Sequence, residues 1–257
     1  MLPRLIVRIL ERCLPLILIA LGACQSPRTL TEPPAARLFQ IHPTRPIDEL
    51  RREALQASPP LEKGDFLQPD LVELSGLDPT LQFDIRYATD HNFLGVPIYQ
   101  HPMAFLQRPA AMALLAAHRE LASRKLGLLI FDAYRPWYVT KIFWDATPAD
   151  LKEYVANPDN GSRHNRGCAV DLTLYDLVSG QPLPMPSGYD EFSERAHLDF
   201  QGGSEQERTN RDLLQNVMRK HGFLPYASEW WHFDFHDWKK YPILNISFEE
   251  LDSPQAP

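Results

Sequence analysis

The chain has 257 residues, of which 44% are apolar, and a formal net charge of −7 at neutral pH. This length allows one large domain or two small ones, with enough apolar residues for a sizeable hydrophobic core. The acidic charge argues against nucleic acid as a partner and against binding to anionic lipid through bulk electrostatic attraction.

The amino terminus has the composition of an export signal. Three arginines precede a short apolar run at residues 13–21, which is about half of the ~20 residues that a membrane span needs. Small residues then lead into Cys24, a pattern that resembles the lipobox of bacterial lipoproteins. We predict a lipoprotein-type signal peptide at residues 1–23, lipidation of Cys24, and export to the periplasmic side as an outer-membrane lipoprotein. An ordinary signal peptide or a lone hydrophobic anchor are the alternatives.

Cysteine usage agrees with export. Cys13 would leave with the signal peptide and Cys24 would carry lipid, so Cys168 alone would remain. No intramolecular disulfide could then form in an oxidising compartment. Burial in the core is the expected protection for a lone thiol.

Residues 24–65 are predicted to be a Pro-rich tether. Seven prolines and mixed charges fall between Gln25 and Pro60, a composition typical of linkers. Residues 47–57 could form one short helix, but no core for it is evident in the sequence. A disordered spacer is therefore the favoured interpretation.

The folded domain is predicted at residues 66–245, followed by a tail at 246–257. Periodicity, turn residues and helix stop signals predict its elements. We expect strands at residues 71–74, 83–88, 128–131, 168–175 and 230–235, and helices at residues 109–125, 138–144, 149–157 and 205–221. Strands and helices do not alternate strictly, which favours a single α+β domain with helices covering one face of a mainly antiparallel sheet.

Two short segments contain the residues that a metal site needs. His164 and Asp171 lie seven residues apart, and His232 follows much later in the chain. Two histidines and one aspartate leave a tetrahedral zinc ion one open position, as a catalytic site requires. Such an ion lowers the pKa of a bound water from 15.7 to roughly 7, so the pattern indicates hydrolysis.

Glu229 and Arg135 are the candidate catalytic side chains. Glu229 lies three residues before His232, so on a flat strand the two would face opposite ways, and we expect a turn or bulge between them. A glutamate there could move protons, which contributes typically ~10²–10⁴ in rate. Arg135 could stabilise an oxyanion or could form a structural pair with Asp132.

Together these segments resemble a known family. The run Ser-x-His-x-x-Gly-x-Ala-Val-Asp from Ser162 to Asp171, with Glu-Trp-Trp-His at 229–232, is similar to the zinc D-alanyl-D-alanine dipeptidases of the VanX type. These belong to a larger group of D,D-peptidases that looks like the Hedgehog amino-terminal domain. Further matching stretches include residues 84–89, 134–136 and 171–174, and the likeness runs from about Val72 to Trp238.

The resemblance implies roles for particular residues. It implies one zinc ion per chain in a cleft at the sheet, with the ligands His164, Asp171 and His232. It implies Glu229 as general base and acid and Arg135 as stabiliser of the transition state. Ser162 would bind the substrate carboxylate and Asp190 its free amine, so that a dipeptide is recognised at both ends.

Three functions are compatible with these residues. The first is a dipeptidase that hydrolyses D-Ala-D-Ala to two D-Ala in cell-wall turnover or recycling, and Asp190 favours it. The second is a D,D-carboxypeptidase that trims peptidoglycan stem peptides, which needs an open cleft on the amine side. The third is a non-catalytic, zinc-containing wall-binding lipoprotein, against which Glu229 and Arg135 argue. The expected partners are a small dipeptide and peptidoglycan fragments, with membrane contact only through the lipid anchor.

The segment between Trp144 and Ser162 departs from the family pattern. It is shorter than in the resistance enzymes of the VanX type, and this loop helps to shape the pocket. The strictness for D-Ala-D-Ala is therefore open at this stage.

Overall fold

The computed structural model describes residues 38–252 of the chain. The predicted signal peptide, Cys24 and the first part of the predicted tether lie outside the described residues. Within the described range, no helix is both long and apolar enough to cross a membrane.

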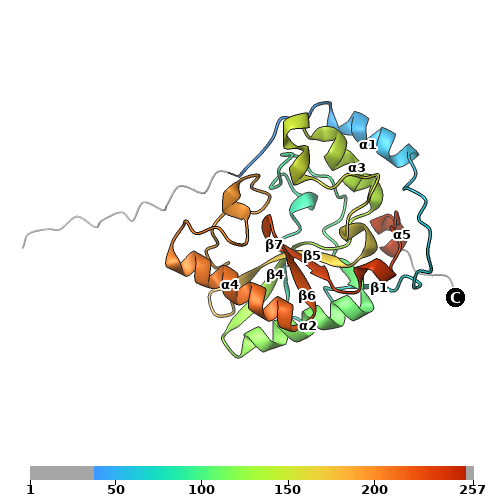
Figure 1. The fold of residues 1–257 in the computed structure, drawn as a ribbon. Coiled ribbons are helices and arrows are strands. Elements are labelled where there is room, and N and C mark those ends of the chain that lie inside the picture. Colours follow the sequence, from blue (N-terminus) through green and yellow to red (C-terminus); the bar gives the residue numbers. More distant parts are fainter. Residues whose placement is uncertain (1–37, 253–257) are drawn as a thin grey trace, which may run out of the picture. The chain divides into compact units, whose positions relative to one another are not determined.

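A five-stranded sheet in the order β2-β4-β5-β7-β6 lies at the centre of the fold (Figure 1). Its three middle strands are β4 (Leu126–Asp132), β5 (Ala169–Asp176) and β7 (Glu229–Phe235). All three pair in antiparallel fashion, and so does the edge strand β6 (Phe223–Tyr226), whereas the other edge strand β2 (Gln82–Phe83) is parallel to β4. The predicted α+β class with a mainly antiparallel sheet is confirmed.

Two long helices cover one face of this sheet. Both α2 (Arg108–Ala122) and α4 (Glu205–Lys220) pack against its strands and against each other (Figure 1). Pro109 occupies the first turn of α2, where its fixed backbone angle fits a helix. A capping box of Ser204 and Glu207 starts α4 and satisfies two backbone N–H groups. These helices bury the apolar side chains of the sheet and leave its opposite face for polar groups.

The tether prediction is wrong for the stretch around residue 50. Residues 47–56 form α1 (Ile47–Gln56), which packs against α3 (Trp137–Ala146) on the other side of the sheet from α2 and α4 (Figure 1). Leu50 and Ala54, one helical turn apart, are completely buried. The core that the sequence alone did not reveal is provided by α3, which lies far away in the sequence.

The predicted tail is also partly wrong. It contains α5 (Phe248–Asp252), and Phe248 is buried against the rings of Tyr99 and Tyr134. Two hydrogen bonds hold the segment: the Tyr134 hydroxyl donates to the carbonyl oxygen of Ile246 and accepts from its backbone N–H. The folded domain therefore extends beyond residue 245.

The strand predicted at residues 83–88 is shorter than expected. Its pairing with β4 ends at Phe83, and the chain then forms a 3₁₀ turn at Arg86–Ala88. A separate antiparallel sheet consists of β1 (Leu71–Glu73) and β3 (Phe105–Gln107). The sequence predicts the first of these strands but not the second. The 3₁₀ turn matters for function, because it directs the Tyr87 side chain into the pocket described below.

Cys168 is completely buried, as expected for a lone thiol. Burial raises its pKa to about 12. Since the thiolate is the reactive form, this thiol is inert at neutral pH.

Candidate metal and catalytic site

The register of the central strands lines up three polar residues across the sheet. Asp171 on β5 pairs with His232 on β7, and on its other side it pairs with Asp132 on β4. Residues in directly paired positions have side chains on the same face. Pairing therefore brings together Asp171 and His232, two of the three predicted metal ligands, although they lie 61 positions apart in the sequence.

His164 reaches the same point from a short turn. It begins a 3₁₀ turn at His164–Arg166 that ends at Gly167, whose φ of 64° lies in the left-handed region. A Cβ atom at position 167 would come within 2.5 Å of the Leu71 side chain. Glycine therefore permits the bend before β5 that the sequence pattern predicts.

The three candidate ligand atoms lie at distances that suit a single metal ion. His164 Nε2 is 3.1 Å from His232 Nδ1 and 3.4 Å from an oxygen of Asp171, and His232 Nδ1 is 3.0 Å from that same oxygen. In a tetrahedral zinc site with the usual metal–ligand distances, neighbouring ligand atoms lie about 3.3 Å from each other. The geometry thus fits a tetrahedral site with three protein ligands.

Hydrogen bonds at the far side of each imidazole show which nitrogen is free. His164 Nδ1 lies 2.6 Å from the carbonyl oxygen of Ala133, which can only accept, so this nitrogen carries the proton. In the same way His232 Nε2 donates to Asp234 at 2.9 Å. When both imidazoles are neutral, two nitrogen lone pairs and a carboxylate oxygen face one another, an arrangement that a cation, whether a metal ion or a proton, stabilises. Outer partners of this kind are usual around metal-binding histidines.

Electrostatics support the same interpretation. Burial alone would lower the pKa of His232, but the carboxylates of Asp234 and Asp171 outweigh it and raise that pKa well above its usual value. The cluster therefore favours a positive charge among its ligand atoms. Tyr189 donates to the second oxygen of Asp171 at 3.0 Å and fixes the orientation of that carboxylate.

An irregularity in the strand pairing places Glu229 beside this cluster. On β6 the neighbours Pro225 and Tyr226 pair with Phe233 and Glu229, so β7 has additional residues between these positions. This bulge lets Glu229 share a face with His232, and its carboxylate lies 3.7 Å from His232 Nδ1. Burial raises the pKa of Glu229 to about 7, and repulsion by Asp171 adds to the effect.

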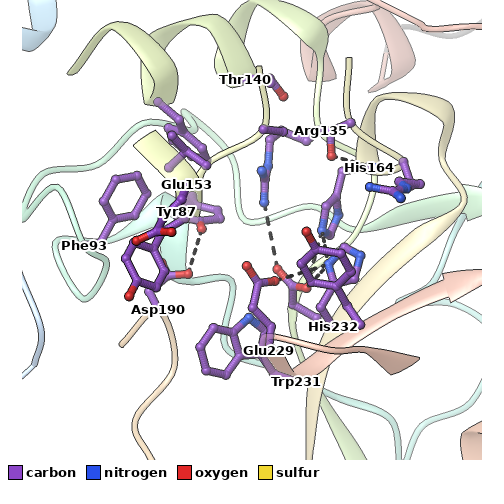
Figure 2. Close-up of a pocket in the computed structure, with 18 residues that line it drawn as sticks. Tyr87, Phe93, Arg135, Thr140, Glu153, His164, Asp190, Glu229, Trp231 and His232 are labelled. Carbon is purple, nitrogen blue, oxygen red and sulfur yellow. Dashed lines mark hydrogen bonds and ion pairs between the residues drawn. The ribbon is translucent and has the colours of Figure 1, made fainter. Parts of the chain in front are cut away.

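Arg135 is both a structural partner and a pocket residue. Its Nε and Nη2 atoms donate to one oxygen of Asp132 at 3.0 and 2.7 Å. The guanidinium also lies 3.8 Å from Asp171 and over the rings of Tyr87 and Phe143. The structural pairing considered for Arg135 is therefore present, and it aims the guanidinium at the centre of the pocket (Figure 2).

Asp190 lies on the other side of the pocket. Figure 2 shows Asp190 and Tyr87 across from His164 and His232, with Glu229 between them. Asp190 accepts a hydrogen bond from the Tyr87 hydroxyl at 3.1 Å, while its second oxygen is buried and has no hydrogen-bond partner among the described residues. Its φ of 56° is strained for a residue with a side chain. A strained residue with an unsatisfied oxygen indicates a ligand-binding role.

Ser162 lines the same pocket near His164. Its hydroxyl oxygen accepts a hydrogen bond from the backbone N–H of His164 at 3.2 Å. The hydroxyl proton is left for another acceptor. All seven residues predicted to bind metal or substrate or to act in catalysis therefore line one cavity of about 130 Å³.

Four supporting residues were not assigned to the site from the sequence. They hold or orient the others, and they are Tyr87, Asp132, Tyr189 and Asp234. A signal existed for Asp234, because it follows His232 by two residues on a strand and so points to the same face. The tyrosines reach the site from loops, which no periodicity reveals.

Known proteins match this chain over most of its length. A family model described as D-ala-D-ala dipeptidase, Peptidase_M15, matches residues 68–250. A D-alanyl-D-alanine dipeptidase of Escherichia coli K12 is 37% identical over 72% of this chain and 94% of its own length. One of Enterococcus faecium is 36% identical over 65% of this chain and 92% of its own length.

A solved structure of the LdcB LD-carboxypeptidase overlaps 51% of this chain and 59% of that chain at 20% identity. Its TM-score of 0.34 is too low to support an inference. The match to the family model covers most of the folded domain and all seven site residues brought together in the pocket. On this basis the chain belongs to the D-Ala-D-Ala dipeptidase family of Peptidase_M15 metallopeptidases.

Proposed function

We propose that this protein is a zinc dipeptidase that hydrolyses D-Ala-D-Ala to two molecules of D-Ala. The observation that carries the proposal is the presence, in one small pocket, of a three-ligand cluster, a free glutamate and the unpaired carboxylate of Asp190. The names of the curated relatives supply the substrate.

Zinc is the proposed metal because of the donor atoms. Two imidazole nitrogens and one carboxylate oxygen, with an open fourth position, are typical of catalytic zinc sites. When bound, the ion polarises the scissile carbonyl group and lowers the pKa of water, so that water can lose a proton and act as a nucleophile at neutral pH. The remaining chemistry belongs to the side chains around it.

Glu229 is the proposed carrier of protons. Its carboxylate takes a proton from the attacking water and passes it to the leaving amine, so it must both gain and lose a proton easily. A pKa of about 7 suits both steps at neutral pH. Arg135, held in place by Asp132, stabilises the negative charge that develops on the carbonyl oxygen.

Recognition of the two ends of the substrate sets its length. The unpaired oxygen of Asp190 would accept a hydrogen bond from the free ammonium group of the dipeptide. Ser162 would donate a hydrogen bond from its hydroxyl group to the carboxylate at the other end. A longer peptide or a blocked amine would leave the buried oxygen of Asp190 unsatisfied, which is costly.

The test compares D-Ala-D-Ala with N-acetyl-D-Ala-D-Ala on the purified, zinc-loaded protein. We expect kcat/KM for the acetylated peptide to be lower by roughly 100-fold, because the buried oxygen of Asp190 loses its hydrogen-bond partner. Equal turnover of both would reject the dipeptidase and favour a D,D-carboxypeptidase. No turnover of either would favour a wall-binding protein.

For the cellular role, we propose an exported lipoprotein that recovers D-Ala from cell-wall turnover. Support comes from the lipobox-like run before Cys24 and from the location of cell-wall breakdown outside the cytoplasm. Labelling of cells with radioactive palmitate should mark the full-length protein but not Cys24→Ser. Equal labelling, or none in either, would contradict lipidation at Cys24.

A further inference from the structure

Arg163, which lies between Ser162 and His164 in the sequence, also lines the pocket. Its side chain is 40% exposed, so it is open to the pocket and to solvent. Its Nε lies 3.4 Å from Asp234 but makes no hydrogen bond among the described residues. This leaves a positive charge at the pocket that protein groups satisfy only in part.

Two aromatic rings hold this guanidinium in place. The central carbon of Arg163 lies 5.7 Å from the centre of the Tyr226 ring and 5.1 Å from that of Trp238. Contacts with ring faces restrict a long side chain while leaving its N–H groups free to bind a ligand. The side chain is therefore positioned in advance for an anion.

The second arginine of the pocket makes the contrast clear. Arg135 uses two nitrogens to bind Asp132. Neither terminal nitrogen of Arg163 donates a hydrogen bond to an acceptor in the described part of the chain, and the guanidinium contacts only ring faces and, through Nε, Asp234. A guanidinium with free N–H groups matches the geometry of a carboxylate, which it can bind with two parallel hydrogen bonds.

Charge complementarity identifies the ligand group. A free dipeptide is a zwitterion with one ammonium and one carboxylate, and the carboxyl group of Asp190, with its unpaired oxygen, is the proposed partner of the ammonium. We propose that Arg163 binds the carboxylate at the other end of the dipeptide, together with the hydroxyl of Ser162, and so makes the enzyme select substrates with a free carboxyl terminus. This inference rests on the proposed dipeptidase function and adds a determinant of its specificity.

A purely structural role would be to support Asp234, which orients His232. The structure argues against this as the main role, because His232 already bonds Asp234 at 2.9 Å while the contact from Arg163 is longer. The two roles predict different results. Loss of a structural support would weaken metal binding and impair all substrates alike, whereas loss of a carboxylate-binding group would impair only substrates that have the carboxylate.

The test uses D-Ala-D-Ala and its carboxy-terminal amide, D-Ala-D-alaninamide, on the zinc-loaded enzyme. For Arg163→Ala we expect the KM of the free dipeptide to rise roughly tenfold or more, with kcat within about threefold, as for loss of a charged hydrogen bond. The KM of the amide should stay within about twofold. Arg163→Lys, which keeps a point charge, should fall between wild type and Arg163→Ala.

Two controls make the result specific. Arg119→Ala removes an exposed arginine on α2, outside the pocket, and should behave as wild type. Zinc content should remain at one per chain in Arg163→Ala. Equal rises in KM for both substrates, or no rise for the free dipeptide, would overturn the proposal.

Binding separates this proposal from the dipeptidase function itself. In the Glu229→Gln background, calorimetric titration with D-Ala-D-Ala measures affinity without turnover. We expect Arg163→Ala to weaken that affinity roughly tenfold. If wild type does not cleave D-Ala-D-Ala, the proposed function fails; if it does and Arg163→Ala binds the dipeptide as tightly as before, only the role of Arg163 fails.

Discussion

At the scale of single residues, the site depends on which atoms have protons and which do not. His164 and His232 each donate an N–H hydrogen bond to an outer acceptor, Ala133 and Asp234, and turn the other ring nitrogen inward. Glu229 comes as close as 3.7 Å to one of these ligands and yet is left free by the bulge in β7. In the proposed mechanism this separates the group that moves protons from the groups that would bind the metal.

The first prediction concerns this separation at Glu229. Replacement by glutamine keeps the size of the side chain but removes its ability to accept a proton. We expect kcat on D-Ala-D-Ala to fall by at least ~10²–10⁴, while the bound zinc, measured by atomic absorption, stays at one per chain. The matched control is Glu73→Gln, an exposed glutamate on β1, which should keep full activity. Full activity in Glu229→Gln would exclude this residue as the base.

At the scale of elements, α1 lies outside the region that the family model matches. The family model begins at residue 68, whereas α1 spans Ile47–Gln56. Backbone hydrogen bonds from Ile41 to Phe93, which lines the pocket, and from Thr44 to Ala146, the last residue of α3, tie down the segment before α1. Its neighbour α3 contributes Thr140 and Phe143 to the pocket. The helix thus supports the scaffold behind the site.

The second prediction tests this packing with two leucines on the same helix. Leu50 is fully buried, whereas Leu55 is 59% exposed. Leu50→Ala should lower the free energy of unfolding by about 2–5 kcal/mol, because it removes buried contacts and leaves a cavity. Leu55→Ala should change it by less than about 0.5 kcal/mol. Urea unfolding of both variants measures the difference, and similar values for the two would mean that α1 is not docked.

At the scale of the whole molecule, the sequence predicted best those features that have a local period or a short motif. The runs that become α2, α4, β5 and β7 were placed within a few residues, because each has apolar residues on one face. The metal cluster and Glu229 were predicted from two short segments. In the structure they converge because the register of the strands aligns them. A short sequence motif does not contain that register.

What could not be predicted depends on contacts between distant segments. Leu50 and Ala54 make an apolar face in any helix, but only the docking of α3 makes that face a core. The edge strand β6 contains Pro225, and a proline in a short run gives no strand signal, although an edge strand tolerates a residue without an N–H. The partners of a charged group, such as Asp132 for Arg135, are likewise chosen by tertiary structure.

The last prediction concerns the metal as a contribution to the stability of the whole domain. Two lone pairs and a carboxylate oxygen, all buried, converge at the cluster, so an ion that binds only the folded state stabilises it. At a free metal concentration of ~1,000 times Kd this amounts to about 4 kcal/mol. For a domain of this size, Tm shifts by roughly 2–4 °C per kcal/mol.

Removal of the metal with a chelator should therefore lower the Tm of the purified protein by roughly 8–16 °C, as measured by scanning calorimetry, and added zinc should restore it. His164→Ala should already melt at the lower temperature and should not respond to the chelator. His91→Ala, which alters an exposed histidine away from the cluster, should respond as wild type does. An unchanged Tm after complete removal of the metal from wild type would mean that the three ligand atoms do not hold an ion in the folded protein.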